Sequence, residues 1–121
     1  MIIMMNMVSE FDQRFADILE ISRRINSDVI NLTRCTLLAV VYCFKDGLQY
    51  RQLKANLDIS DGKLISNLNK LRDMGYVEKK EEVLDKKTLD VYTISSKGEE
   101  ELKKVLVWAD LISRFKEACD K

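Results

Sequence analysis

The chain has 121 residues, of which 46% are hydrophobic and 33% charged, and its 20 basic and 20 acidic residues give a net charge of zero. These values are typical of one soluble folded domain over residues 1–121 and unlike those of a disordered tail. The sequence contains no histidine, which excludes the common zinc sites and histidine-dependent catalytic triads. A neutral chain does not by itself indicate nucleic-acid binding.

The three cysteines, Cys35, Cys43 and Cys119, lack CxxC spacing, which argues against a disulfide framework and a thiolate metal site. Apolar neighbours favour a buried structural role for Cys35, whereas its place in a first helical turn would allow a lowered thiol pKa. The apolar opening MIIMMNMV has no basic leader, and no run reaches the roughly 18 to 20 apolar residues of a membrane span. We therefore expect a cytoplasmic protein with no membrane partner and no cofactor.

The first half of the chain predicts three helices and a short strand. Apolar residues at alternating steps of four and three predict a helix over about residues 7–25. The segment TRCTLLAVVYCFKDG predicts a central buried helix, with Thr33 as its cap and Gly47 as its left-handed C-terminal residue. Residues 48–50 could form a very short strand before a polar helix, RQLKANL.

The segment SDGKLISNLNKLRDMG predicts a helix over about residues 61–74, capped by Ser60 or Asp61 and ended by Gly75. Backbone needs at the helix ends explain Gly62 and Gly75. Three leucines define the inward stripe of this helix: Leu64, Leu68 and Leu71. The strands YVEKK and TLDVYTIS follow, and the charged segment EEVLDKK between them predicts a β-hairpin with a solvated tip.

The last helix is expected over residues 96–119, with two adjoining apolar stripes. Together with the first helix it presents more apolar surface than one small domain needs, which predicts a homodimer formed by the terminal helices. Trp108 and Phe115 could instead line a cavity for a small-molecule effector of unknown identity. The expected dimer-interface residues are Phe11, Phe15, Ile18, Val105, Trp108, Ile112 and Phe115.

The order of these elements predicts a winged helix-turn-helix, mainly α with a small β-hairpin. Its core spans residues 33–95, between N- and C-terminal dimerisation helices. In this fold the second helix of the pair lies in the DNA major groove, so the helix over 61–74 is the expected recognition helix.

The residues LKANLDISDGKLISNLNKLRDMGYVEKK, followed by TLDVYTISSKGEEEL, resemble winged-helix regulators related to the multiple antibiotic resistance regulator (MarR) family. The resemblance covers about residues 33–106 and implies a homodimeric, sequence-specific transcriptional regulator of duplex DNA rather than an enzyme. The chain departs from the family in the closing step over residues 93–98 and in an acidic wing, which argues against strong contact between wing and DNA. The acidic wing residues are Glu78, Glu81, Glu82 and Asp85.

Polar residues opposite the leucine stripe are candidates for DNA contact, because asparagine can pair with adenine edges and lysine can reach guanine or phosphate. These candidates are Lys63, Ser66, Asn67, Asn69 and Lys70. Candidates for phosphate contact outside this helix are Arg51, Lys54, Lys86 and Lys87. Two alternatives remain open: these polar residues could simply solvate an exposed face, and the neutral chain with its acidic wing could be a protein-interaction module without DNA binding.

Overall fold

The computed structural model describes residues 13, 15–29 and 31–120. The chain divides into two compact units, one of residues 27–102 and one formed by the described parts of 1–26 and 103–121.

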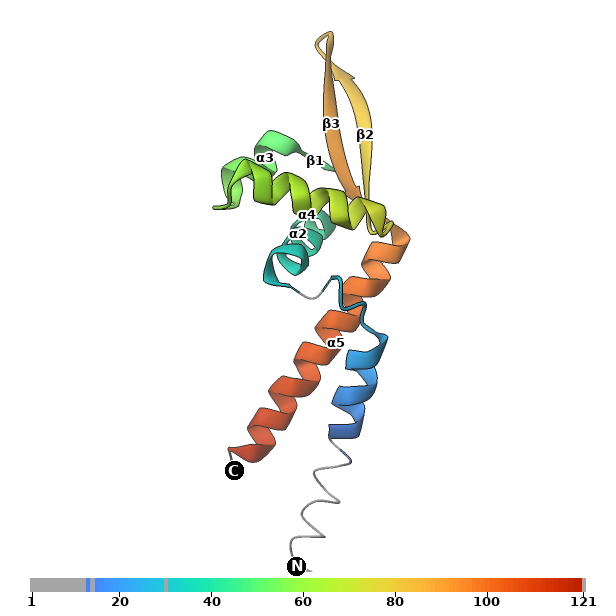
Figure 1. The fold of residues 1–121 in the computed structure, drawn as a ribbon, viewed down its shortest axis with the longest axis vertical. Helices are drawn as coiled ribbons and strands as arrows, with labels where there is room; N and C mark the ends of the chain where they lie inside the picture. Colours follow the sequence, from blue (N-terminus) through green and yellow to red (C-terminus); the bar gives the residue numbers. More distant parts are fainter. Residues whose placement is uncertain (1–12, 14, 30, 121) are drawn as a thin grey trace, which may run out of the picture. The chain divides into compact units, whose positions relative to one another are not determined.

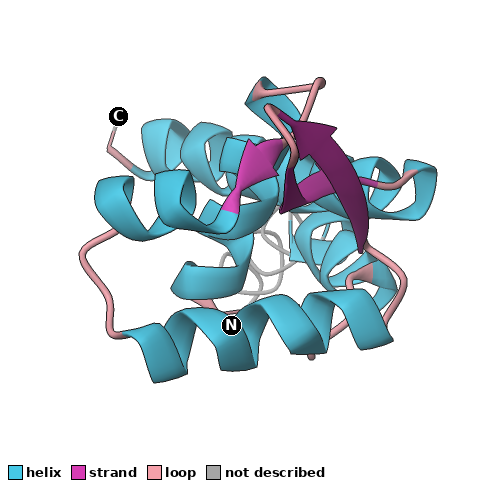
Figure 2. Ribbon diagram, turned by 90° about the horizontal axis from the view of Figure 1, so that it is seen from above, coloured by secondary structure: helices cyan, strands magenta, loops and turns pink. Residues whose placement is uncertain are grey.

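The unit of residues 27–102 contains helices packed with a small antiparallel sheet (Figure 1), whose strands are magenta in Figure 2. The strand order in the sheet is β1-β3-β2. This arrangement confirms the predicted winged-helix fold, mainly α with a small β wing. The elements are α2 (Leu32–Cys43), β1 (Leu48–Gln49), α3 (Tyr50–Asn56), α4 (Asp61–Asp73), β2 (Val77–Leu84), β3 (Lys87–Ile94) and the start of α5 (Ser96–Cys119).

The core of this unit lies between α2 and α4. Burying a leucine side chain contributes roughly 1.5–3 kcal/mol relative to exposing it, so these two helices hold much of the fold's stability. The predicted central helix and inward leucine stripe are both confirmed. The residues at the centre of the core, all at most 1% exposed, are Leu37, Leu38, Val41, Leu64, Leu68 and Leu71.

The ends of α2 differ from the prediction. Asn31, not Thr33, is the N-cap, because the Asn31 side chain accepts a hydrogen bond from the Arg34 backbone N–H at 2.7 Å. The helix ends at Cys43, and Gly47, at φ +101°, lies in the turn that leads to β1 rather than at the helix end.

The wing also differs from the prediction, because the charged segment expected as a loop continues both strands. Glu81 pairs with Asp90 and Val83 with Thr88, so the ladder reaches almost to the tip. Only Asp85 and Lys86 form the turn, with φ of 50° and 67°. Positive φ at both central residues is the geometry of a type I′ turn, which matches the right-handed twist of the flanking strands.

The segment that follows α4 packs against the start of α5. Gly75, at φ +79°, ends α4 as predicted, and the Tyr76 N–H bonds the Leu71 carbonyl at 2.9 Å. The Ser95 hydroxyl then donates to the Gly75 carbonyl at 2.6 Å. A Cβ at Gly98 would lie 2.2 Å from the Tyr76 carbonyl oxygen, so only glycine allows this close approach.

In the other unit, residues 15–24 are helical and lie beside the C-terminal part of α5 (Figure 1). The rings of Phe15 and Phe115 meet edge to face at a centroid distance of 5.0 Å, and Lys104 Nζ donates to the Arg24 carbonyl at 3.3 Å. Residues 7–12 of the predicted first helix lie outside the described residues. The last helix ends at Cys119 as predicted.

None of the helices in the described part of the chain combines the length and apolarity needed to cross a membrane.

Candidate nucleic-acid interface

Hydrogen bonds from residues on both helices hold the turn between α3 and α4 in place. The Tyr50 hydroxyl donates to Asp61 Oδ1 at 2.8 Å, and this hydrogen bond raises the pKa of the Tyr50 phenol. Lys54 Nζ donates to the Ile59 carbonyl at 2.5 Å. Ser60 caps α4, since its hydroxyl accepts from the Lys63 N–H at 3.2 Å. These contacts fix where α4 begins relative to α3.

Four of the five predicted contact residues on α4 lie on its exposed face: Lys63, Ser66, Asn69 and Lys70. Lys63 and Lys70 follow one edge of this face, because residues seven apart return to nearly the same angle on a helix. Within the described part of the chain, none of the four side chains makes a hydrogen bond through its terminal polar group. The face is therefore free to bind a partner, and its ammonium, amide and hydroxyl groups suit base edges and phosphates.

The prediction that Asn67 faces outward is wrong. Its side chain is only 8% exposed, Oδ1 accepts from Arg34 Nε at 3.0 Å, and Nδ2 donates to the Lys63 carbonyl at 2.7 Å. The physical reason is helical spacing, because Asn67 lies three residues after Leu64 and four before Leu71, on the buried stripe. Asn67 thus ties α4 to α2 and is not available to a base.

Sequence reasoning missed two residues of this helix pair. Arg34, on α2, holds Asn67 and also donates to the Asp28 carbonyl. Ile65 is 48% exposed and lies on the outward face of α4, one turn before Asn69. An isoleucine outside the leucine stripe was the signal that could have identified it.

The predicted phosphate contacts are more dispersed than those on α4. Arg51 is exposed on α3, whereas Lys54 is half-buried and its ammonium already donates to the Ile59 carbonyl. Lys86 and Lys87 are exposed at the tip of the β2–β3 hairpin, which projects from the core (Figure 1). The structure therefore gathers the α4 residues on one face and leaves the wing lysines apart from them.

The expected dimer residues form an incompletely covered apolar surface on the unit that holds residues 15–24 and 103–120. Phe15 is 43% exposed and Ile112 is 37% exposed. Leu19, Leu106 and Val107 add further exposed apolar area on the same helices, with Leu106 58% exposed. The half-buried members of the predicted set are Ile18, Val105, Trp108 and Phe115, and Phe11 lies outside the described residues.

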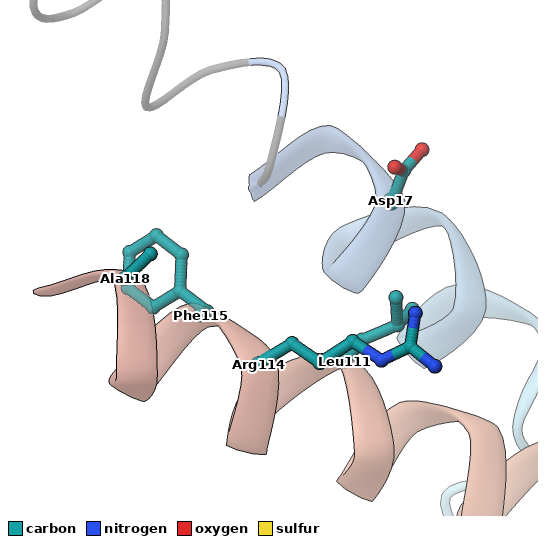
Figure 3. A pocket seen from close by; sticks show the side chains of 5 residues that line it. All are labelled: Asp17, Leu111, Arg114, Phe115 and Ala118. Atoms are coloured by element: carbon teal, nitrogen blue, oxygen red, sulfur yellow. The ribbon is translucent and has the colours of Figure 1, made fainter.

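A hollow of about 250 Å³ lies between these two helices, with Asp17 on one helix and four lining residues on α5 (Figure 3). Of the two residues expected in an effector cavity, Phe115 lines this hollow and Trp108 does not, and the volume is below the roughly 300–1,000 Å³ of ligand pockets. Arg114 at its rim is paired with Asp110 at 3.1 Å. The lining residues are Asp17, Leu111, Arg114, Phe115 and Ala118.

Comparison with known proteins gives three findings. The family model for winged helix DNA-binding domains matches residues 33–111. An uncharacterised protein of Methanocaldococcus jannaschii is 34% identical over 71 residues, which are 56% of this chain and 73% of that protein. The structure of a transcriptional regulator homologue from Pyrococcus horikoshii matches with a TM-score of 0.66 and 18% identity, covering 90% of this chain and 99% of the other. At this identity, the last match is a likeness of fold.

Proposed function

Because the chain belongs to the winged helix DNA-binding domain family, we propose that it is a non-catalytic transcriptional regulator that binds duplex DNA sequence-specifically as a MarR-like homodimer. The observation that carries this proposal is the outward face of α4. The helix is anchored by buried leucines, whereas the terminal polar groups of Lys63, Ser66, Asn69 and Lys70 project without partners among the described residues. A rigid helix with such a face suits the major groove.

The residues of this face divide by chemistry into two roles. Asn69 and Ser66 can hydrogen-bond base edges, and a good bidentate pair discriminates against the wrong base by about 1–3 kcal/mol. Lys63 and Lys70 lie at the edge of the face, where their long side chains reach guanine or phosphate, and Arg51 extends the phosphate contacts onto α3. The chain is neutral overall, so binding to random DNA is weak and a true site is needed for tight binding.

The exposed apolar side chains of Phe15 and Ile112 support the homodimer, because a second copy of the chain would cover them. A twofold dimer presents two α4 helices and reads a palindromic site, with half-sites about 34–36 Å apart or a multiple of it. Sedimentation at micromolar concentration tests this step. A full-length protein that sediments as a monomer contradicts both the dimer and the palindrome.

Selection from a random duplex pool tests the function. The folded protein should enrich a palindromic site that it binds at least about 10³-fold more tightly than random duplex at physiological salt, measured by fluorescence anisotropy with nonspecific competitor. Lys70→Ala should weaken both kinds of binding and lower the salt dependence, whereas Asn69→Ala should weaken only specific binding. Failure of the folded protein to enrich any site contradicts the proposal.

The wing favours a second candidate function, a winged-helix module that binds another protein. Residues 77–94 hold five acidic residues and four lysines, which is unfavourable beside DNA phosphates. Val83 is 71% exposed and Leu84 is 49% exposed near the hairpin tip. If no DNA site is enriched, the chain is instead a module that binds a protein partner at this hairpin tip. Val83→Asp should then abolish binding of that partner.

A further inference from the structure

The outward face of α4 has an uncharged centre, although one third of the chain's residues are charged. Four exposed residues without charge follow this centre: Gly62, Ile65, Ser66 and Asn69. Lys63 and Lys70 lie along one edge of it, and Arg72 and Asp73 come at its C-terminal end. A helix that faced only water would gain nothing from an uncharged strip, whereas a helix in the major groove places its centre on the bases and its edges near the phosphates.

Ile65 is the apolar residue among these four, and neither contact with water nor packing in the protein's own core explains an apolar side chain at this position. Its side chain is 48% exposed and lies outside the stripe of buried leucines. Among the groups that base pairs display in the major groove, the 5-methyl of thymine is the apolar one. A thymine methyl is therefore the group on a DNA duplex that best matches Ile65.

Asn69 lies one turn after Ile65 on the same face, and its side-chain amide makes no hydrogen bond to any of the described residues. An asparagine amide pairs in bidentate fashion with N6 and N7 of adenine. Four residues of helix rise by about 6 Å, which is close to two base-pair steps of about 3.4 Å each. Ile65 and Asn69 can therefore contact base pairs within about two steps of one another.

We propose, on the basis of the DNA-binding function above, that α4 recognises a half-site core of A·T pairs, in which a thymine methyl packs on Ile65 and an adenine pairs with Asn69. Ile65 is then a specificity-determining residue. A core of G·C pairs would place the polar amino group of cytosine against Ile65 and would leave the apolar surface of this residue without a matching partner.

The test uses the full-length protein and the duplex enriched from the random pool. Each core thymine is replaced in turn by deoxyuridine, which lacks only the 5-methyl. One of these replacements should weaken binding about fourfold per half-site, since burying one methyl-sized group contributes about 0.8 kcal/mol. Ile65→Ala should weaken binding to the thymine duplex by a similar or larger factor and should no longer distinguish thymine from deoxyuridine at that position.

Val83→Ala is the matched control, because it also truncates an exposed apolar side chain of the same unit. This variant should distinguish thymine from deoxyuridine as the parent does. In the same way, replacing the core adenine by 7-deazaadenine should weaken the parent but not Asn69→Ala. Circular dichroism melting verifies that each variant is folded.

Three results would overturn the inference and leave the regulator intact: a core without A·T pairs, an affinity unaffected by every deoxyuridine, or an Ile65→Ala variant that still senses the methyl. The absence of any enriched site overturns the inference and the regulator together. These outcomes are therefore distinguishable.

Discussion

Asn67→Ala should lower the free energy of unfolding by about 1.5–3 kcal/mol, the range for a hydrogen bond to a charged group. The substitution removes the acceptor that holds Arg34 Nε at 3.0 Å and leaves a half-buried guanidinium without that partner. It also removes the Nδ2 bond to the Lys63 carbonyl at 2.7 Å. That carbonyl lies within α4, so the second bond adds less to the loss.

Asn69→Ala is the matched control, because it changes the same residue type two positions later on the same helix. Asn69 is exposed, so its loss should change the free energy of unfolding by no more than about 0.5 kcal/mol. For DNA affinity the order of the two variants should be reversed, with Asn69→Ala more affected than Asn67→Ala. Asn69→Ala should cost about 1–3 kcal/mol on the preferred site, whereas folded Asn67→Ala should keep the parent's ratio of specific to nonspecific affinity.

Urea unfolding followed by far-UV circular dichroism measures both variants. A cycle with Arg34→Ala isolates the contact, and the coupling between Arg34 and Asn67 should be within about 0.5–3 kcal/mol. If Asn67→Ala is as stable as the parent while Asn69→Ala unfolds more easily, the assignment of the inward and outward faces of α4 is refuted.

Leu68→Ala should cost about 2–5 kcal/mol in the same assay, because Leu68 is 1% exposed in the core, and a loss below about 1 kcal/mol would contradict this. Gly62→Ala should stabilise the fold by up to about 1 kcal/mol, since a Cβ there meets nothing within 4 Å. The same substitution should weaken DNA binding, because Gly62 lies on the outward face of α4. An unchanged affinity for DNA would show that Gly62 does not contact it. Burial raises the pKa of the Cys35 thiol, so at pH 8 maleimide should label exposed Cys43 and Cys119 faster, and faster labelling of Cys35 would contradict this.

The elements that could be predicted from sequence are those whose periodicity is set by burial. The leucines of α4 recur at helical spacing because one side of the helix packs on α2, so the helix, its inward stripe and the glycine that ends it were all predictable. The same periodicity also places Asn67 on the inward side of α4, so the error in its prediction came from its residue type. A polar residue type suggested an exposed position, and its bond to Arg34 spans 33 residues of sequence, which no local pattern reveals.

The wing and the glycines show a second limit. Charged residues suggested a loop over 81–87, but the outer part of the hairpin over residues 78–88 is exposed and can carry charges within its strands, and pairing with β3 decides where the strands end. Gly62 was explained by backbone needs, yet its backbone is not in the left-handed region and its surroundings are open. Gly98 is required by a close approach to the Tyr76 carbonyl, a contact that depends on how the wing closes against α5.

Amide chemical-shift mapping tests most directly whether the outward face of α4 binds duplex DNA. The enriched duplex is titrated into ¹⁵N-labelled full-length protein at physiological salt, with a scrambled duplex as the control. The largest specific changes should fall on residues 61–73, centred on Ile65, Ser66 and Asn69. Changes confined to the wing tip or to the terminal helices, with α4 unaffected, would contradict the claim.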